Sequence, residues 1–263
     1  MKLPEPPPAH VVMSSDGLKL ATYEWGDPDA PTVLAVHGFA SSAILNFMRT
    51  GWTRDLTRAG FHVIGVDQRG HGASDKPHDP ALYNLDRLVQ DILNVLDTYL
   101  IDEAHYVGYS LGARVGWQVA LDAPDRITRA VLGGIPDGQP LTRFRTDQAL
   151  DFLDTGEPVT DRITNAYLTM ASAMPNNDLR ALVALVNGMR GGPEPSPAHA
   201  PSQPILFATG SEDAIVERSR RLAHAASRGH FFTIPDRHHF NAPTSRHFRD
   251  AAIEWLSEAP NVG

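Results

Sequence analysis

A serine lies between two glycines in the segment Gly108-Tyr109-Ser110-Leu111-Gly112, where an apolar run gives way to an amphipathic one. A sharp turn from a strand into a helix exposes such a serine above a sheet, and the glycines let neighbouring elements approach. The next backbone amide, that of Leu111, then lies at a helix N-terminus and can bind an oxyanion. A helix N-cap is the other role open to Ser110. The strand before it and the helix after it favour a nucleophile.

A serine nucleophile needs a histidine to take its proton and a carboxylate to orient that histidine. The downstream segment PILFATGSEDAIV ends a predicted strand and presents Glu212 and Asp213. The later segment GHFFTIPDRHHFNAP ends the last predicted strand and presents His238 and His239. Local chemistry alone does not choose between the two histidines, because both lie in one loop. The order serine, acid, histidine along the chain is one of the orders in which catalytic triads occur.

The elements that must position these residues alternate along the chain. Apolar runs typical of buried strands and runs with helical spacing follow one another. Strands, the first three of them entering tight turns, are predicted within residues 31–38, 61–70, 104–112, 126–135, 204–210 and 229–235. Helices are predicted at residues 85–100, 113–123, 219–227 and 244–259. This alternation predicts the α/β class, with a mostly parallel sheet flanked by helices and ligands bound beyond the carboxyl ends of its strands.

The alternation is interrupted between residues 136 and 203, where helical fragments are separated by glycine and proline and no strand pattern occurs. The stretch GGPEPSPAHAPSQP within it is typical of an extended linker. We therefore predict one core domain, made of residues 1–135 and 204–263, and a small helical cap of residues 136–203. The cap is inserted after the strand at residues 126–135, which is taken as the sixth strand of the complete sheet.

Composition narrows the class of protein. The formal net charge of −8 and the scattered basic residues argue against a nucleic-acid partner. The chain has no cysteine, which excludes disulfides, thiolate catalysis and cysteine-ligated zinc. No histidine-rich metal motif occurs, and no run approaches the ~20 apolar residues of a membrane span. We therefore expect a soluble, cytoplasmic protein that acts on a small molecule and needs neither metal nor cofactor.

Five segments in chain order resemble the motifs of the α/β-hydrolase fold superfamily, and the resemblance covers nearly the whole chain. They are AVHGFASS, GVDQRGHGASDKP, GYSLG, GSEDAIV and IPDRHHFNAP. The resemblance implies a catalytic triad of Ser110, Asp213 and His239, and oxyanion donors at the amides of Phe39 and Leu111. Some relatives carry the acid after the preceding strand, which here is Asp137.

Other polar residues near these motifs have less specific interpretations. His37 is expected to be a buried, hydrogen-bonded packing residue. A turn network that braces the site is expected from Asp67, Arg69, His71 and Ser74. Arg114 lies one helical turn beyond Ser110, where it can pair with a nearby carboxylate or bind a carboxylate of the substrate.

The predicted function is that of an esterase, a hydrolase that cleaves a small to medium, hydrophobic carboxylic ester through an acyl-enzyme. The apolar and small polar residues expected near the pocket are Phe39, Ile44, Leu45, Asn46, Leu141, Phe144, Phe152, Tyr167, Met170 and Met174. A carbon–carbon bond hydrolase or a lactonase of the same fold would use the same triad. A ligand receptor that keeps the triad without turnover is an alternative of a different class.

Overall fold

The computed structural model describes residues 5–138, 143–174 and 176–258, and its centre is a sheet of eight strands. The strands are β1 His10–Met13, β2 Lys19–Trp25, β3 Thr32–Val36, β4 His62–Val66, β5 Ala104–Tyr109, β6 Ile127–Gly133, β7 Ile205–Gly210 and β8 Gly229–Ile234. Their order across the sheet is β1-β2-β4-β3-β5-β6-β7-β8. The strands from β4 to β8 in this order are parallel, which confirms the predicted mostly parallel α/β sheet.

The first two strands were not predicted from the sequence. Strand β1 pairs antiparallel with β2, and β2 pairs antiparallel with β4. In β1 only Val12 is buried, so this strand lacks the continuous apolar run that marks a strand covered on both faces. Its place at the edge of the sheet therefore leaves no clear signal in the local sequence.

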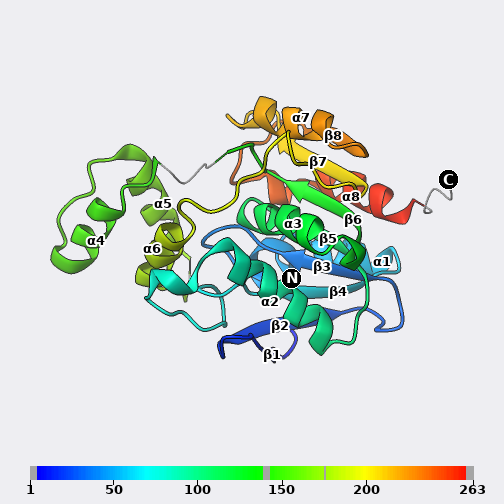
Figure 1. Cartoon of the computed structure of the whole chain (residues 1–263), viewed down its shortest axis with the longest axis horizontal. Helices are drawn as coiled ribbons and strands as arrows, with labels where there is room; N and C mark the ends of the chain where they lie inside the picture. The colour runs from blue at the N-terminus through cyan, green and yellow to red at the C-terminus, as the bar shows by residue number, and fades with distance from the viewer. Residues whose placement is uncertain (1–4, 139–142, 175, 259–263) are drawn as a thin grey trace.

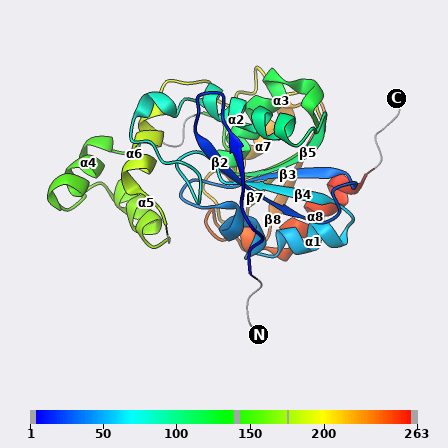
Figure 2. The same cartoon turned by 90° about the horizontal axis from the view of Figure 1, so that it is seen from below.

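Helices cover both faces of the sheet. They are α1 Trp52–Arg58, α2 Leu85–Thr98, α3 Leu111–Asp122, α4 Thr146–Thr155, α5 Arg162–Ser172, α6 Leu179–Gly188, α7 Val216–Ala225 and α8 Arg246–Ser257. Figure 2 shows α2, α3 and α7 on one face and α1 and α8 on the other. In β3, Leu34 belongs to the core on the first face and Val33 to the core on the second. Successive side chains of a strand point to opposite faces, so a strand covered on both faces is apolar throughout.

The helices α4, α5 and α6 lie between β6 and β7 in the sequence, and Figure 1 shows them to one side of the sheet. They have a small apolar core of their own, made of Phe144, Ala149, Leu168, Val183 and Val186. The side-chain Nδ2 of Asn177 donates a hydrogen bond of 3.0 Å to the backbone carbonyl of Ala40, in the loop after β3. Within the described ranges, no helix combines the length and the apolar character needed to cross a membrane.

Candidate active site

Ser110 lies in the tight turn between β5 and α3, with the backbone angles φ 52° and ψ −109°. A positive φ is uncommon for a residue with a side chain and costs on the order of 1–3 kcal/mol. Both flanking glycines are required by close backbone approach. A Cβ added at Gly112 would lie 2.0 Å from the carbonyl oxygen of Val36, and one added at Gly108 would lie 2.6 Å from that of Gly112. The turn therefore holds the serine in a strained position at the carboxyl end of β5.

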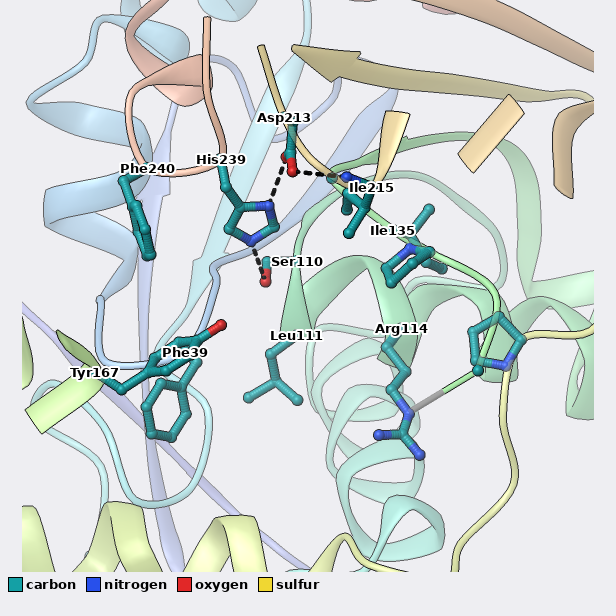
Figure 3. Close-up of a pocket in the computed structure, with 14 residues that line it drawn as sticks. Phe39, Ser110, Leu111, Arg114, Ile135, Tyr167, Asp213, Ile215, His239 and Phe240 are labelled. Carbon is teal, nitrogen blue, oxygen red and sulfur yellow. Dashed lines mark hydrogen bonds and ion pairs between the residues drawn. The ribbon is translucent and has the colours of Figure 1, made fainter. Parts of the chain in front are cut away.

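The loops after β7 and β8 bring a carboxylate and an imidazole to this serine (Figure 3). His239 Nε2 lies 3.0 Å from Ser110 Oγ, and His239 Nδ1 lies 2.8 Å from Asp213 Oδ2. The carboxylate of Asp213 only accepts, so His239 Nδ1 donates to it and Nε2 is left to accept from the serine hydroxyl. Asp213 is buried and also accepts from the backbone amide of Ile215 at 3.2 Å. The three side chains form one hydrogen-bonded chain.

The alternative candidates for the histidine and the acid, His238 and Asp137, have other partners. His238 is exposed, and its ring accepts a hydrogen bond from the amide of Phe240 at 3.2 Å. The carboxylate of Asp137 is paired with Arg218 at 2.7 Å and Arg221 at 2.9 Å, and these two cations lower its pKa despite partial burial. The structure thus brings His239 and Asp213 to the serine and leaves His238 and Asp137 outside this chain of hydrogen bonds.

The backbone of the loop after β3 forms a second wall of the site. His37 Nδ1 donates to the carbonyl of Gly38 at 2.7 Å, and His37 Nε2 accepts from the amide of Gln68 at 3.1 Å. The Gly38 carbonyl and the Phe39 N–H belong to one planar peptide and point in opposite directions. The hydrogen bond from His37 therefore fixes the direction of the Phe39 amide. Within the described part of the chain, neither this amide nor that of Leu111 has a hydrogen-bond partner.

A second buried histidine holds the next residue of the same loop. His71 Nε2 accepts from the amide of Ala40 at 3.0 Å, and His71 Nδ1 donates to the carbonyl of Arg69 at 3.1 Å. The centroids of the His37 and His71 rings are 5.0 Å apart. Burial lowers the pKa of His37 to about 4 and, together with the nearby His37, lowers the pKa of His71 to about 3. Both rings are therefore neutral at pH 7, as their acceptor roles require.

The remaining polar residues of this region form the expected turn network. The carboxylate of Asp67 accepts from the amides of Ala43 at 2.7 Å and Ala73 at 2.8 Å, and burial raises its pKa. The hydroxyl of Ser74 donates to the Asp67 carbonyl. These groups lie behind the loop and line neither of the two cavities beside Ser110.

Two cavities, of about 250 Å³ and about 350 Å³, flank Ser110. Both are lined by Phe39, Ser110, Tyr167, His239 and Phe240. The smaller cavity is also lined by Leu111, Arg114, Gly134, Ile135, Pro136, Gly138, Pro195, Asp213 and Ile215. The larger cavity is also lined by Gly38, Ala40, Ser41, Leu45, Asn46, Thr50, Tyr109, Met170, Met174, Pro243 and Thr244. The inserted helix α5 contributes Tyr167 and Met170, so the insertion forms part of the wall.

Most residues expected at the pocket line one of these cavities, and three described ones do not. Ile44 packs against a small cluster beneath β2, Phe144 lies in the apolar core of the insertion, and Phe152 is on the exposed side of α4. Leu141 lies outside the described residues. The prediction for Ile44, Phe144 and Phe152 was based on residue type alone. In the helical turn of residues 44–48, Leu45 and Asn46 line the cavity and Ile44 does not.

Three features around the candidate site were not predicted. The hydroxyl of Tyr109 donates to the carbonyl of His239 at 2.5 Å, so the residue before the serine anchors the histidine loop. Phe240 lines both cavities. The side-chain oxygen of Asn46 accepts from the Gly38 amide at 3.3 Å, while its Nδ2 is buried without a partner in the described structure. The contact of Tyr109 joins residues 130 positions apart, and no local pattern announces it.

Comparison with known proteins finds relatives that share this fold. The family model described as alpha/beta hydrolase fold matches residues 31–176. Epoxide hydrolase A of Mycobacterium tuberculosis is 33% identical over 132 residues, which are 49% of this chain and 39% of that protein. The match therefore spans well under half the length of this curated relative.

Two solved structures share the fold over 95% of this chain. A hydrolase from Pseudomonas aeruginosa has a TM-score of 0.78 and 24% identity, with 98% of its own chain covered. The enol-lactonase from Burkholderia xenovorans has a TM-score of 0.75 and 22% identity, with its whole chain covered. At this identity the likeness shows a common fold and leaves the substrate open.

Proposed function

Because the chain belongs to the alpha/beta hydrolase fold family, we propose that it hydrolyses small to medium, hydrophobic carboxylic esters through Ser110, His239 and Asp213. The observation that carries the proposal is the position of His239 between the Ser110 hydroxyl, at 3.0 Å, and the Asp213 carboxylate, at 2.8 Å. A serine so placed can lose its proton to the imidazole as it attacks a carbonyl.

The proposed reaction has two halves. Ser110 Oγ attacks the ester carbonyl while His239 Nε2 takes its proton, and the Asp213 carboxylate stabilises the imidazolium. The amides of Phe39 and Leu111 donate to the oxyanion, which collapses as His239 returns the proton to the leaving alcohol. Water then attacks the acyl-enzyme with His239 as base, and release of the acid restores the serine. Every proton is carried by the imidazole, so the reaction needs no cofactor.

The surroundings of the serine support an ester with two apolar parts. Cavities of about 250 Å³ and about 350 Å³ lie beside Ser110, enough for an acyl group and an alcohol group of modest size. Aromatic and aliphatic side chains, including Phe39, Tyr167 and Met170, form much of their walls. Binding of a hydrophobic ester is therefore favoured by burial of its apolar surface.

The nucleophile argues against an epoxide as the substrate, although the relative reported above is named an epoxide hydrolase. Epoxide hydrolases of this fold place an aspartate at the elbow, and this chain has Ser110 there. A carboxylate nucleophile forms an ester intermediate from an epoxide, whereas an activated serine is suited to attack on a carbonyl carbon.

Labelling with a fluorophosphonate, followed by a panel of p-nitrophenyl esters and lactones of graded size, tests this proposal. We expect the wild-type protein and the Ser227→Ala control, whose serine is exposed and remote, to be labelled equally. Ser110→Ala should lose both labelling and ester turnover while keeping its thermal melting curve. Equal labelling or turnover in Ser110→Ala would overturn the proposal, and lactones turned over faster than all linear esters would redirect it to ring opening.

A further inference from the structure

The side chain of Arg114 lines the smaller cavity. Arg114 lies in the first turns of α3, four residues after Ser110, and only 6% of its surface is exposed. Figure 3 shows it on the side of the pocket away from Phe240, beyond Leu111. A guanidinium group is thus buried beside the proposed nucleophile, in a cavity whose other walls are mainly apolar.

Arg114 differs from the other buried arginines in having no ion pair with any carboxylate of the described residues. Arg69 lies 2.7 Å from Asp91, Arg129 lies 3.0 Å from Glu258, and Arg249 lies 2.7 Å from Asp55. Those three, together with Arg114, are the buried arginines of the described residues.

The hydrogen bonds of the Arg114 guanidinium leave most of its donors unused. Its Nη2 donates to the neutral carbonyl of Pro193 at 2.8 Å, and its Nε is buried without a partner. Within the described part of the chain, Arg114 forms no ion pair and Nη1 has no partner. The bond to Pro193 satisfies one donor, and the carboxylate of Glu194 acts on the guanidinium only from beyond ion-pair distance.

This arrangement is costly for the free protein. Burial of a cation without a counterion is unfavourable, and burial accordingly lowers the pKa of Arg114, although Glu194 acts in the opposite direction. The N-terminal end of α3 carries a partial positive charge of its own, which adds to the unfavourable potential. The unpaired guanidinium is therefore a site in the cavity wall at which an anion from outside would find a cation and free donors.

We propose that Arg114 binds a carboxylate carried by the substrate, so that the ester also bears a free acid group that enters the smaller cavity. The guanidinium fork matches a carboxylate, and bonds of this kind are stronger than neutral ones. The apolar walls formed by Leu111, Ile135 and Ile215 fit a short methylene spacer between the two groups. The favoured substrate class is then a monoester of a dicarboxylic acid, an inference that rests on the ester hydrolysis proposed above.

A matched pair of substrates tests this inference. Monoethyl adipate carries the carboxylate, and its ω-amide replaces it with a neutral group of the same size. Arg114→Gln removes the charge while keeping an amide that can donate to the Pro193 carbonyl, and Arg114→Lys restores the charge. Arg246→Gln is the control, because it removes the same charge from an exposed position on α8. Ethanol release gives kcat/KM for each substrate.

We expect wild type and Arg246→Gln to prefer the carboxylate substrate, and Arg114→Gln to lower the preference ratio roughly 10- to 100-fold, mainly through KM. Arg114→Lys should recover part of it. The ratio cancels any general loss of folded protein, which melting curves report separately. A ratio unchanged in Arg114→Gln, or a wild-type preference for the amide, would overturn the inference.

Calorimetric titration of both compounds into Ser110→Ala separates this inference from the proposed chemistry. If no ester is turned over, the proposed function fails. The anion site would still be supported if Ser110→Ala binds monoethyl adipate more tightly than its amide and if the added substitution Arg114→Gln removes this difference. Equal binding of the two compounds, or no binding of the carboxylate compound at millimolar concentration, would overturn it.

Discussion

Acid should destabilise this protein through the two histidines that hold the loop after β3. His37 and His71 are fully buried, and both act as hydrogen-bond acceptors through Nε2. Their pKa values fall from 6.5 to about 4 and about 3, because burial disfavours the charged rings. The folded protein therefore keeps them neutral at a pH where the unfolded chain binds protons. Their contribution to the free energy of unfolding is complete above pH 6.5 and is lost as the pH falls from 6.5 toward 4 and below.

The size of the effect follows from the pKa values. For His37 alone the difference between 6.5 and about 4 corresponds to about 3 kcal/mol. The contribution of His71 is not simply added, because its lowered pKa already includes the effect of His37. Between pH 6 and pH 4.5 each ring contributes up to about 1.4 kcal/mol per pH unit. Since domains of this kind are stable by about 5–15 kcal/mol, such a loss is large.

Urea unfolding followed by tryptophan fluorescence at pH 7.5, 6.0, 5.25 and 4.5 measures this slope. His71→Gln should be less stable than wild type at pH 7.5, because the Ala40 amide loses its acceptor. Its free energy of unfolding should nevertheless fall less steeply with acid, by up to about 1.4 kcal/mol per pH unit. His247→Gln, at an exposed position on α8, should run parallel to wild type. A His71→Gln slope equal to that of wild type would refute the reasoning.

Three further predictions concern the proposed site. His239→Ala should lower kcat for esters about 10³-fold or more, because the serine loses its base, whereas His238→Ala should change it less than about threefold; steady-state kinetics of both variants decide between them. Asp213→Asn should lower kcat on the order of 10⁴-fold by favouring the wrong histidine tautomer, and Asp137→Asn should leave kcat within a fewfold of wild type; equal losses would contradict the assignment of the acid. Gly112→Ala places a Cβ 2.0 Å from a backbone oxygen of β3, so urea unfolding should show a loss of about 3 kcal/mol or more, and a loss below about 1 kcal/mol would contradict the close approach.

The sequence by itself determined those features that depend on near neighbours in the chain. Apolar runs and helical spacing located β3 to β8 and the helices α2, α3, α7 and α8, because each pattern reports the burial of one short segment. The short helix α1 was not predicted. The glycines around Ser110 predicted the sharp turn, since their missing side chains are needed within that turn and against β3. The order of acid and histidine along the chain followed from where the last strands end. The family and the architecture were therefore predictable from local patterns.

The tertiary structure decided what depends on partners distant in the chain. Asp137 and Asp213 both follow strands, but in the fold Asp137 is paired with two arginines of α7 whereas Asp213 contacts the imidazole of His239. His238 and His239 are adjacent in one loop and have the same local chemistry, but in the fold only His239 of the two contacts Ser110. The sequence also did not predict the edge strand β1 or the absence of an ion pair at Arg114 in the described structure. The physical reason is that burial, charge pairing and cavity walls are set by contacts between segments that the chain brings together only when it folds.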